Sequence, residues 1–125
     1  MSPPEGRAAS VLIADDDALV RSVLRIALTR AGFTVAEACD AVEVIAAVQT
    51  HHPDLVVLDI NMPGGSLEET LSALRARQAE IPILVLSGEA EPPYELLGTT
   101  FDFARKPISL DDLLTRVNTL LDHPH

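Results

Sequence analysis

The stretch LVVLDINMPGG, residues 55–65, decides the fold that the sequence predicts. Four apolar residues lead directly to a carboxylate, Asp59, and the chain then reaches Pro63-Gly64-Gly65, which favours a turn. An unbroken run of Leu and Val is typical of a parallel strand that is covered on both faces. A charge at the end of such a buried strand is therefore expected to have a function at the edge of the sheet.

The rest of the chain repeats this alternation of short apolar runs and helical segments. Five runs are predicted as strands, at residues 10–14, 33–38, 54–59, 81–87 and 101–104. Segments of helical periodicity lie between and after them, at 17–31, 40–51, 66–79 and from Ser109 onward. Such alternation predicts an α/β fold with a doubly wound parallel sheet, whose functional crevice lies at the carboxyl ends of the strands.

The predicted helices carry apolar faces and capping residues. Asp17 and Asp40 are expected to cap the first two helices. The first helix has one apolar stripe, made of Leu19, Val23, Leu24, Ala27 and Leu28. The last helix is expected to bury its apolar residues, which are Leu110, Leu113, Leu114, Val117, Leu120 and Leu121. Between Gly88 and Thr100, Pro92-Pro93 leaves room for one or two helical turns at most.

Length and composition limit the class of protein. The 125 residues predict one domain at 9–122, with a flexible lead-in at 1–8 and a short tail at 123–125. A formal net charge of -10 argues against direct nucleic-acid binding, which depends on Lys and Arg. No apolar run reaches membrane-spanning length. The single cysteine, Cys39, excludes an intramolecular disulfide, so we expect a reducing, cytoplasmic location.

Polar residues of a matching kind follow the predicted strands. Asp15 and Asp16 follow the first strand, Asp59 ends the third, Ser87 ends the fourth, and Lys106 follows the fifth. If the first and third strands are neighbours, three carboxylates converge, which is costly unless a cation lies among them. Carboxylate oxygens suit a hard cation, and Mg²⁺ is the cofactor that this set predicts.

A metal beside a carboxylate, a hydroxyl and an ammonium indicates phosphoryl transfer. Asp59 would attack phosphorus and become an aspartyl phosphate, while Mg²⁺ and Lys106 neutralise the phosphoryl oxygens and Ser87 donates to one of them. Lys106 is the only lysine among nine basic residues. A compact ammonium suits this task as a point charge, so its placement here supports the same chemistry.

Four motifs in order, VLIADDDALVR, LVVLDINMPG, VLSG and ARKPI, resemble the receiver domain of two-component response regulators, including its small chemotaxis members. The resemblance covers residues 9–122. It implies a flavodoxin-like five-stranded sheet with strand order 2-1-3-4-5. Only 19 positions separate Ser87 from Lys106, which implies a shortened fourth helix between them.

The resemblance also implies roles for the acidic residues. Asp59 matches the phosphoacceptor of the family. Asp15 and Asp16 match its acidic pair, with Asp16 as a direct metal ligand and Asp15 acting through water. Asn61 is expected to offer its backbone carbonyl to the metal.

Further positions match the residues that respond to the phosphoryl group. Ser87 corresponds to the switch hydroxyl, Lys106 to the phosphate-contacting lysine, and Phe103 to the switch aromatic. The family typically has a cis Lys-Pro bond, so Lys106-Pro107 is expected to be cis. Asn61 and Glu89 resemble the residues that shorten the lifetime of the phosphoryl group in chemotaxis receivers.

The function implied is that of a phosphoacceptor in a phosphorelay, which is a signalling module and no enzyme beyond its own phosphorylation and dephosphorylation. A histidine kinase or phosphotransfer protein would be the donor, and a downstream protein or a linked domain the target. The sequence does not decide whether the protein forms a weak dimer. It also does not decide whether the receiver is a stand-alone regulator or part of a larger chain. It also leaves open a degenerate receiver that serves as a binding or dimerisation platform. A haloacid-dehalogenase-type phosphatase fits poorly. That family expects a second Asp, the general acid, two residues after its nucleophile, and here that position is Asn61.

Overall fold

The fold is described from a computed structural model, which describes residues 9–60, 62–64, 67–77, 81–88 and 101–122. Within these ranges the strands are β1 Ser10–Ala14, β2 Thr34–Ala38, β3 Leu55–Asp59, β4 Ile83–Ser87 and β5 Phe101–Arg105. The helices are α1 Ala18–Arg30, α2 Ala41–His51, α3 Leu67–Arg77 and α4 Leu110–Asp122. The elements follow the predicted alternation along the chain.

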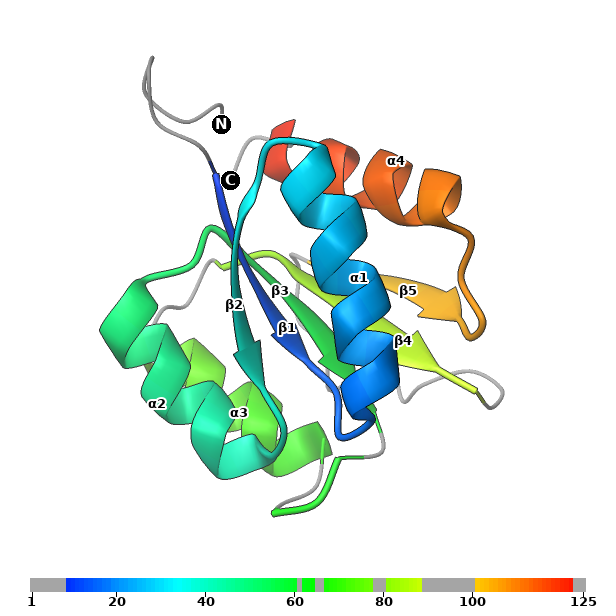
Figure 1. Cartoon of the computed structure of the whole chain (residues 1–125). Helices are drawn as coiled ribbons and strands as arrows, with labels where there is room; N and C mark the ends of the chain where they lie inside the picture. Colours follow the sequence, from blue (N-terminus) through cyan, green and yellow to red (C-terminus); the bar gives the residue numbers. More distant parts are fainter. Residues whose placement is uncertain (1–8, 61, 65–66, 78–80, 89–100, 123–125) are drawn as a thin grey trace.

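The five strands form one parallel sheet in the order β2-β1-β3-β4-β5, as the resemblance implies (Figure 1). The predicted doubly wound fold is therefore confirmed. The register of the two central strands positions the site, because Ala14 at the end of β1 lies opposite Leu58 of β3. The residues that follow Ala14 and Leu58 consequently emerge side by side at the carboxyl edge of the sheet.

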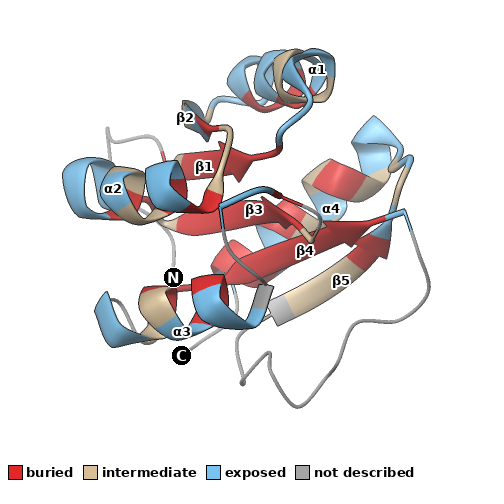
Figure 2. Cartoon of the chain, turned by 90° about the horizontal axis from the view of Figure 1, so that it is seen from below, coloured by how far each residue is buried: buried red, intermediate tan, exposed pale blue. Residues whose placement is uncertain are grey.

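Helices cover both faces of the sheet, α1 and α4 on one face and α2 and α3 on the other (Figure 1). Successive residues of each strand alternate between the two cores. Val57 packs into the core beneath α1 and α4, whereas Val56 and Leu58 pack into the core beneath α2 and α3. Figure 2 shows β1, β3 and β4 buried between these layers. Every residue of β3 is buried, which explains its unbroken apolar run.

Side chains cap α1 and α2 as predicted. Asp17 caps α1 by accepting from the amides two and three residues along the chain, at 2.9 and 3.3 Å. Asp40 caps α2 by accepting from the amide of Glu43 at 2.8 Å, and Glu43 accepts in turn from the amide of Cys39 at 2.8 Å. Ser109 accepts from an amide in the first turn of α4. These bonds satisfy helix N–H groups that would otherwise lack partners.

Three apolar residues expected on buried faces are exposed instead. Leu19 and Val23 of α1 and Leu110 of α4 have 73%, 46% and 45% of their surface accessible. Leu19 and Val23 are four residues apart and lie on the flank of α1, beside the stripe that Leu24 and Leu28 bury. All three line an apolar groove of about 470 Å³ between α1 and the start of α4.

Some predictions fall on segments outside the described residues. These are the shortened fourth helix at 89–100, the lead-in at 1–8 and the tail at 123–125. The label α4 consequently belongs to the last helix of the chain. None of the helices in the described ranges has the length and apolar character needed to cross a membrane.

Candidate functional site

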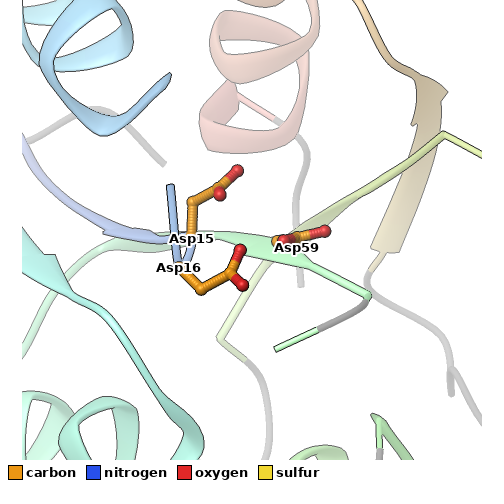
Figure 3. Close-up of side chains that lie close together, drawn as sticks. All are labelled: Asp15, Asp16 and Asp59. Atoms are coloured by element: carbon orange, nitrogen blue, oxygen red, sulfur yellow. The ribbon is translucent and has the colours of Figure 1, made fainter. Parts of the chain in front are cut away.

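Three aspartates from two strand ends meet at the carboxyl edge of the sheet. Asp15 and Asp16 directly follow β1, and Asp59 is the last residue of β3. Carboxylate oxygens of the three residues all lie within 4.8 Å of one another (Figure 3). Asp15 and Asp59 are only 1% and 6% exposed, whereas Asp16 is exposed. The parallel register therefore gathers the carboxylates into one cluster, in which Asp15 and Asp59 are buried and Asp16 is exposed.

Lys106 lies against two of these carboxylates. Its Nζ donates to Asp15 Oδ2 at 2.7 Å and lies 3.4 Å from Asp59 Oδ1. Its backbone N–H donates to the carbonyl of Ser87 at 2.8 Å, which fixes the loop after β5 beside the end of β4. The Lys106-Pro107 peptide bond is cis, so this expectation is confirmed.

Two opposing effects act on the charge of Lys106. Partial burial lowers the pKa of its ammonium, because the charged form loses hydration. The hydrogen bond with Asp15 and the negative charges of Asp59 and Asp15 raise it, and together they outweigh burial. The pKa of Lys106 is therefore above its ordinary value, and the side chain is a cation at neutral pH.

Ser87 and Phe103 belong to the neighbouring strands β4 and β5. Ser87 ends β4 and is buried, with Arg105 of β5 opposite it in the register. Phe103 is half-buried and packs against the core beneath α2 and α3. Asn61 and Glu89 lie outside the described residues, so their roles remain predictions.

The carboxylate cluster has the chemistry of a magnesium site. All three groups offer hard oxygen ligands, which Mg²⁺ prefers. Their combined negative charge exceeds what the ammonium of Lys106 neutralises, so a divalent cation would improve the balance. The residues present therefore fit the cation that the sequence predicts.

Two contacts in this site were not anticipated from the sequence. Lys106 contacts Asp15 more closely than Asp59. Arg21, in the first turn of α1, donates from Nη1 to the backbone carbonyl of Asp15 at 2.7 Å. Its position six residues after Asp15 was a usable signal, because a long side chain in the first turn of a helix can reach back to the preceding strand.

Residues 11–118 match the sequence profile of the response regulator receiver domain family. The chain belongs to this family. Receiver domains of response regulators are signalling domains of two-component systems and are not classical enzymes. The recognition made from the four motifs is therefore confirmed.

Curated relatives include longer regulatory proteins. The transcriptional regulatory protein PrrA of Mycobacterium tuberculosis is 37% identical over 114 residues, covering 89% of this chain and 49% of that protein. The probable transcriptional regulatory protein TcrX of the same organism is 30% identical over 124 residues, covering 97% of this chain and 53% of that protein. This receiver chain thus spans about half the length of the curated relatives it matches.

Solved receiver structures have the same fold. The chemotaxis response regulator CheY4 of Vibrio cholerae superposes with a TM-score of 0.83 at 29% identity, covering 91% of this chain and 99% of that one. The receiver domain of the hybrid histidine kinase CckA gives a TM-score of 0.79 at 29% identity, with 91% and 100% covered. The receiver fold therefore occurs both in a chemotaxis regulator and in a hybrid kinase among the similar structures.

Proposed function

We propose that this receiver domain accepts a phosphoryl group on Asp59 in a Mg²⁺-dependent reaction and signals by a change of conformation. The observation that carries the proposal is the convergence of Asp15, Asp16 and Asp59 with the ammonium of Lys106. Asp59 is a buried carboxylate that can attack phosphorus, and the ammonium of Lys106 beside it can neutralise part of the charge of the phosphoryl group.

The reaction forms one bond and breaks one. A carboxylate oxygen of Asp59 attacks phosphorus while the bond to the donor's leaving group breaks, and its electron pair leaves with an imidazole nitrogen or a carboxylate oxygen. Bound Mg²⁺, held by Asp16, Asp59 and the carbonyl of Asn61, with Asp15 acting through water, would supply positive charge to the phosphoryl oxygens. In the later hydrolysis step water attacks phosphorus, the bond between phosphorus and the Asp59 oxygen breaks, and the Asp59 carboxylate is regenerated with release of inorganic phosphate.

The other residues of the site bind and report the group. Lys106 holds its positive charge beside Asp59 and can shift from Asp15 towards a phosphoryl oxygen. The Ser87 hydroxyl donates to the same group, and Phe103 changes its rotamer in response. Asn61 and Glu89 orient the hydrolytic water and so shorten the life of the phosphoryl state.

The partners follow from this role. A histidine kinase or a phosphotransfer protein supplies the phosphoryl group, and a downstream protein or a linked domain reads the state. Curated relatives twice as long as this chain, which are called transcriptional regulatory proteins, support a linked domain. The receiver, at 9–122, would itself contact no nucleic acid, because the net charge is -10, and would act in the cytoplasm.

The proposal is tested by intact-mass measurement after incubation with acetyl phosphate and Mg²⁺. We expect one phosphoryl adduct on the wild type and none on Asp59→Asn or when Mg²⁺ is withheld. Asp17→Asn is the matched control, since Asp17 caps α1 and Asn is an equally good cap. This control should be phosphorylated like the wild type.

A wild type that gains no adduct, and binds no beryllofluoride as a phosphoryl mimic, would refute the proposal. The degenerate platform would then be the better description. Multiple-turnover hydrolysis of a phosphate monoester that is lost in Asp59→Asn would instead support the phosphatase alternative, because that family also uses a strand-end Asp as its nucleophile.

A further inference from the structure

Arg21 links three elements behind the carboxylate cluster. It lies in the first turn of α1, and its Nη1 donates to the carbonyl oxygen of Asp15 at the end of β1, at 2.7 Å. Its Nε donates to Glu37 Oε1 of β2 at 3.3 Å. Only 18% of the Arg21 side chain is exposed, so this half-buried guanidinium is held at two points, by the Asp15 carbonyl and by Glu37.

With this contact, both backbone groups and both carboxylate oxygens of Asp15 have partners. The N–H donates to the carbonyl of Ala38 at 3.1 Å, and the carbonyl accepts from Arg21. Oδ1 accepts from the amide of Asp17 at 2.9 Å, and Oδ2 accepts from Lys106 at 2.7 Å. Asp15 is consequently held in one orientation from several directions.

The carbonyl of Asp15 belongs to the peptide plane that joins Asp15 to Asp16. Because a peptide unit is planar and rigid, holding its oxygen fixes the direction in which the chain enters Asp16. Arg21 therefore bears on the position of both acidic residues, although its bond to this segment is to the Asp15 carbonyl and not to a carboxylate. This contact acts at the point where β1 ends and the cluster begins.

We propose that Arg21 is a positioning residue for the cation site, which locks the Asp15-Asp16 peptide and so presents both carboxylates to the metal. The inference rests on the proposed function, in which these residues hold Mg²⁺. The charge of Arg21 by itself opposes cation binding, and the carboxylate of Glu37 offsets it. The contribution of Arg21 is therefore geometric, and removing it should weaken metal binding in spite of the charge that is removed.

Arg25 provides a matched control for the charge. It lies one turn further along α1 and pairs with the same carboxylate, since its Nε is 3.3 Å from Glu37 Oε2. Arg21→Met and Arg25→Met each remove one guanidinium from a Glu37 pair, and only Arg21 is bonded to Asp15. A pure charge effect would strengthen Mg²⁺ binding in both variants, whereas a positioning effect would weaken it in Arg21→Met alone.

The first measurement is Mg²⁺ affinity by isothermal titration calorimetry on metal-stripped protein. Arg21→Met should bind Mg²⁺ roughly tenfold more weakly than the wild type, as is typical when a residue that orients a metal ligand is lost. Arg25→Met should bind at least as tightly as the wild type. Equal affinities of the two variants, or tighter binding by Arg21→Met, would overturn the proposal.

The second measurement uses no metal. Hydrogen exchange of the Asp17 amide, which donates to Asp15 Oδ1, should accelerate in Arg21→Met and stay at the wild-type rate in Arg25→Met. If the wild type binds no Mg²⁺, the proposed function fails, and this comparison still decides the role of Arg21. An unchanged exchange rate in Arg21→Met would overturn that role.

A second pair of variants guards against loss of the fold. If Arg21→Met does not fold, Arg21→Lys is compared with Arg25→Lys, because both keep the positive charge and lose the planar fork. Weaker Mg²⁺ binding and faster Asp17 exchange confined to Arg21→Lys would support the positioning role. Matching values in the two lysine variants would refute it.

Discussion

At the scale of single residues, the site already contains a cation of its own. The ammonium of Lys106 lies between the carboxylates of Asp15 and Asp59, 2.7 and 3.4 Å from their nearest oxygens. Only 25% of the Lys106 side chain is exposed, so solvent screens these contacts less than it screens a surface ion pair. Lys106 thus neutralises part of the acidic cluster and competes with any second cation for Asp15.

Replacing Lys106 by Met should lower stability and strengthen metal binding. Two buried carboxylates would lose their counter-charge, which typically costs about 3 kcal/mol of unfolding free energy. The affinity for Mg²⁺ should rise roughly tenfold, because the cation no longer competes with a charged hydrogen bond. Urea denaturation with and without Mg²⁺ measures the first effect, and calorimetric titration measures the second.

The control for this variant is Arg105→Met, which removes an exposed charge from the neighbouring position. It should leave both quantities close to the wild-type values. A Lys106→Met protein with wild-type stability in EDTA would contradict the prediction.

The raised pKa of Lys106 determines where stability depends on pH. Partial burial alone would lower this pKa, but the bond with Asp15 and the charges of Asp59 and Asp15 raise it in the folded protein. The stabilisation is therefore complete below the ordinary lysine pKa and is lost as pH rises through the higher folded value. The stability difference between wild type and Lys106→Met should be constant around neutral pH and shrink in strong alkali. A difference that already falls between neutral and mildly alkaline pH would contradict this.

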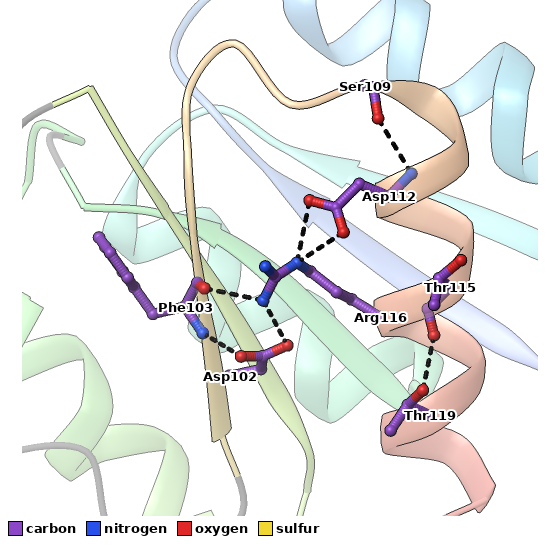
Figure 4. Close-up of polar contacts among 7 residues, drawn as sticks. All are labelled: Asp102, Phe103, Ser109, Asp112, Thr115, Arg116 and Thr119. Carbon is purple, nitrogen blue, oxygen red and sulfur yellow. Dashed lines mark hydrogen bonds and ion pairs between the residues drawn. The ribbon is translucent and has the colours of Figure 1, made fainter.

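At the scale of elements, Arg116 joins α4 to the edge strand β5 (Figure 4). Its Nη1 donates to Asp102 Oδ2 at 2.8 Å and to the Phe103 carbonyl at 3.0 Å, while its Nε donates to both carboxylate oxygens of Asp112. The amide of Phe103 donates to Asp102 Oδ1. Side chains thus satisfy both backbone groups of Phe103 on an edge strand, where such groups are otherwise open to association.

A double-mutant cycle should detect this link. Asp102→Asn and Arg116→Met should show a coupling free energy of about 0.5–1 kcal/mol, because the pair is close but partly exposed. Urea denaturation of the two single variants and the double variant gives this value. The control cycle pairs Arg116→Met with Asp111→Asn, an exposed residue in the first turn of α4, and should be additive. Equal coupling in both cycles would contradict a specific link.

The turn after β3 is tied to the start of α2. The amide of Ala41 donates to the carbonyl of Pro63 at 3.0 Å, and Gly64 has φ of 91°, a conformation that favours glycine. A Cβ at Gly64 would lie 3.4 Å from the backbone nitrogen of Ala41. The turn that follows Asp59 therefore depends on the absence of a side chain.

Gly64→Ala should lower the free energy of unfolding by roughly 1–2 kcal/mol, the cost of a left-handed conformation for a residue with a Cβ. Gly88→Ala is the control, because its added Cβ would meet no atom within 4 Å and its φ is not positive. Chemical denaturation of both variants tests the difference. A Gly64→Ala protein as stable as Gly88→Ala would show that the turn tolerates a side chain.

At the scale of the whole molecule, the site draws on elements from nearly the full length of the chain. Asp15 follows β1, Asp59 and Ser87 end β3 and β4, and Lys106 follows β5. The groups meet only when the central strands are in register. A cation that binds at this cluster would therefore be linked to folding, since it would need the assembled cluster and would stabilise the folded state alone.

Mg²⁺ should therefore raise the stability of the wild type. At a concentration of 100 times its Kd, the gain in unfolding free energy should be about 2.7 kcal/mol, and EDTA should reverse it. Urea denaturation in Mg²⁺, and in NaCl at matched ionic strength, separates specific binding from general screening of the net charge of -10. An equal gain in NaCl would argue against a specific site.

The sequence by itself determined the architecture and the edge at which the site lies. Unbroken apolar runs identified the strands, Asp17 and Asp40 identified helix starts, and polar residues at strand ends identified the carboxyl edge. These signals are local, and the geometry of a parallel sheet converts them into a common location. The strand order came from the resemblance of four motifs to the receiver family and was confirmed.

Only the tertiary structure decided which groups contact one another within that edge. The closer approach of Lys106 to Asp15 than to Asp59, and the bond from Arg21 to the Asp15 carbonyl, depend on how β1, α1 and β5 are placed. The exposure of Leu19 and Leu110 depends on the rotation of each helix against the sheet. Hydrophobic periodicity records which side of a helix is apolar, whereas contacts between distant segments arise only when all layers pack together.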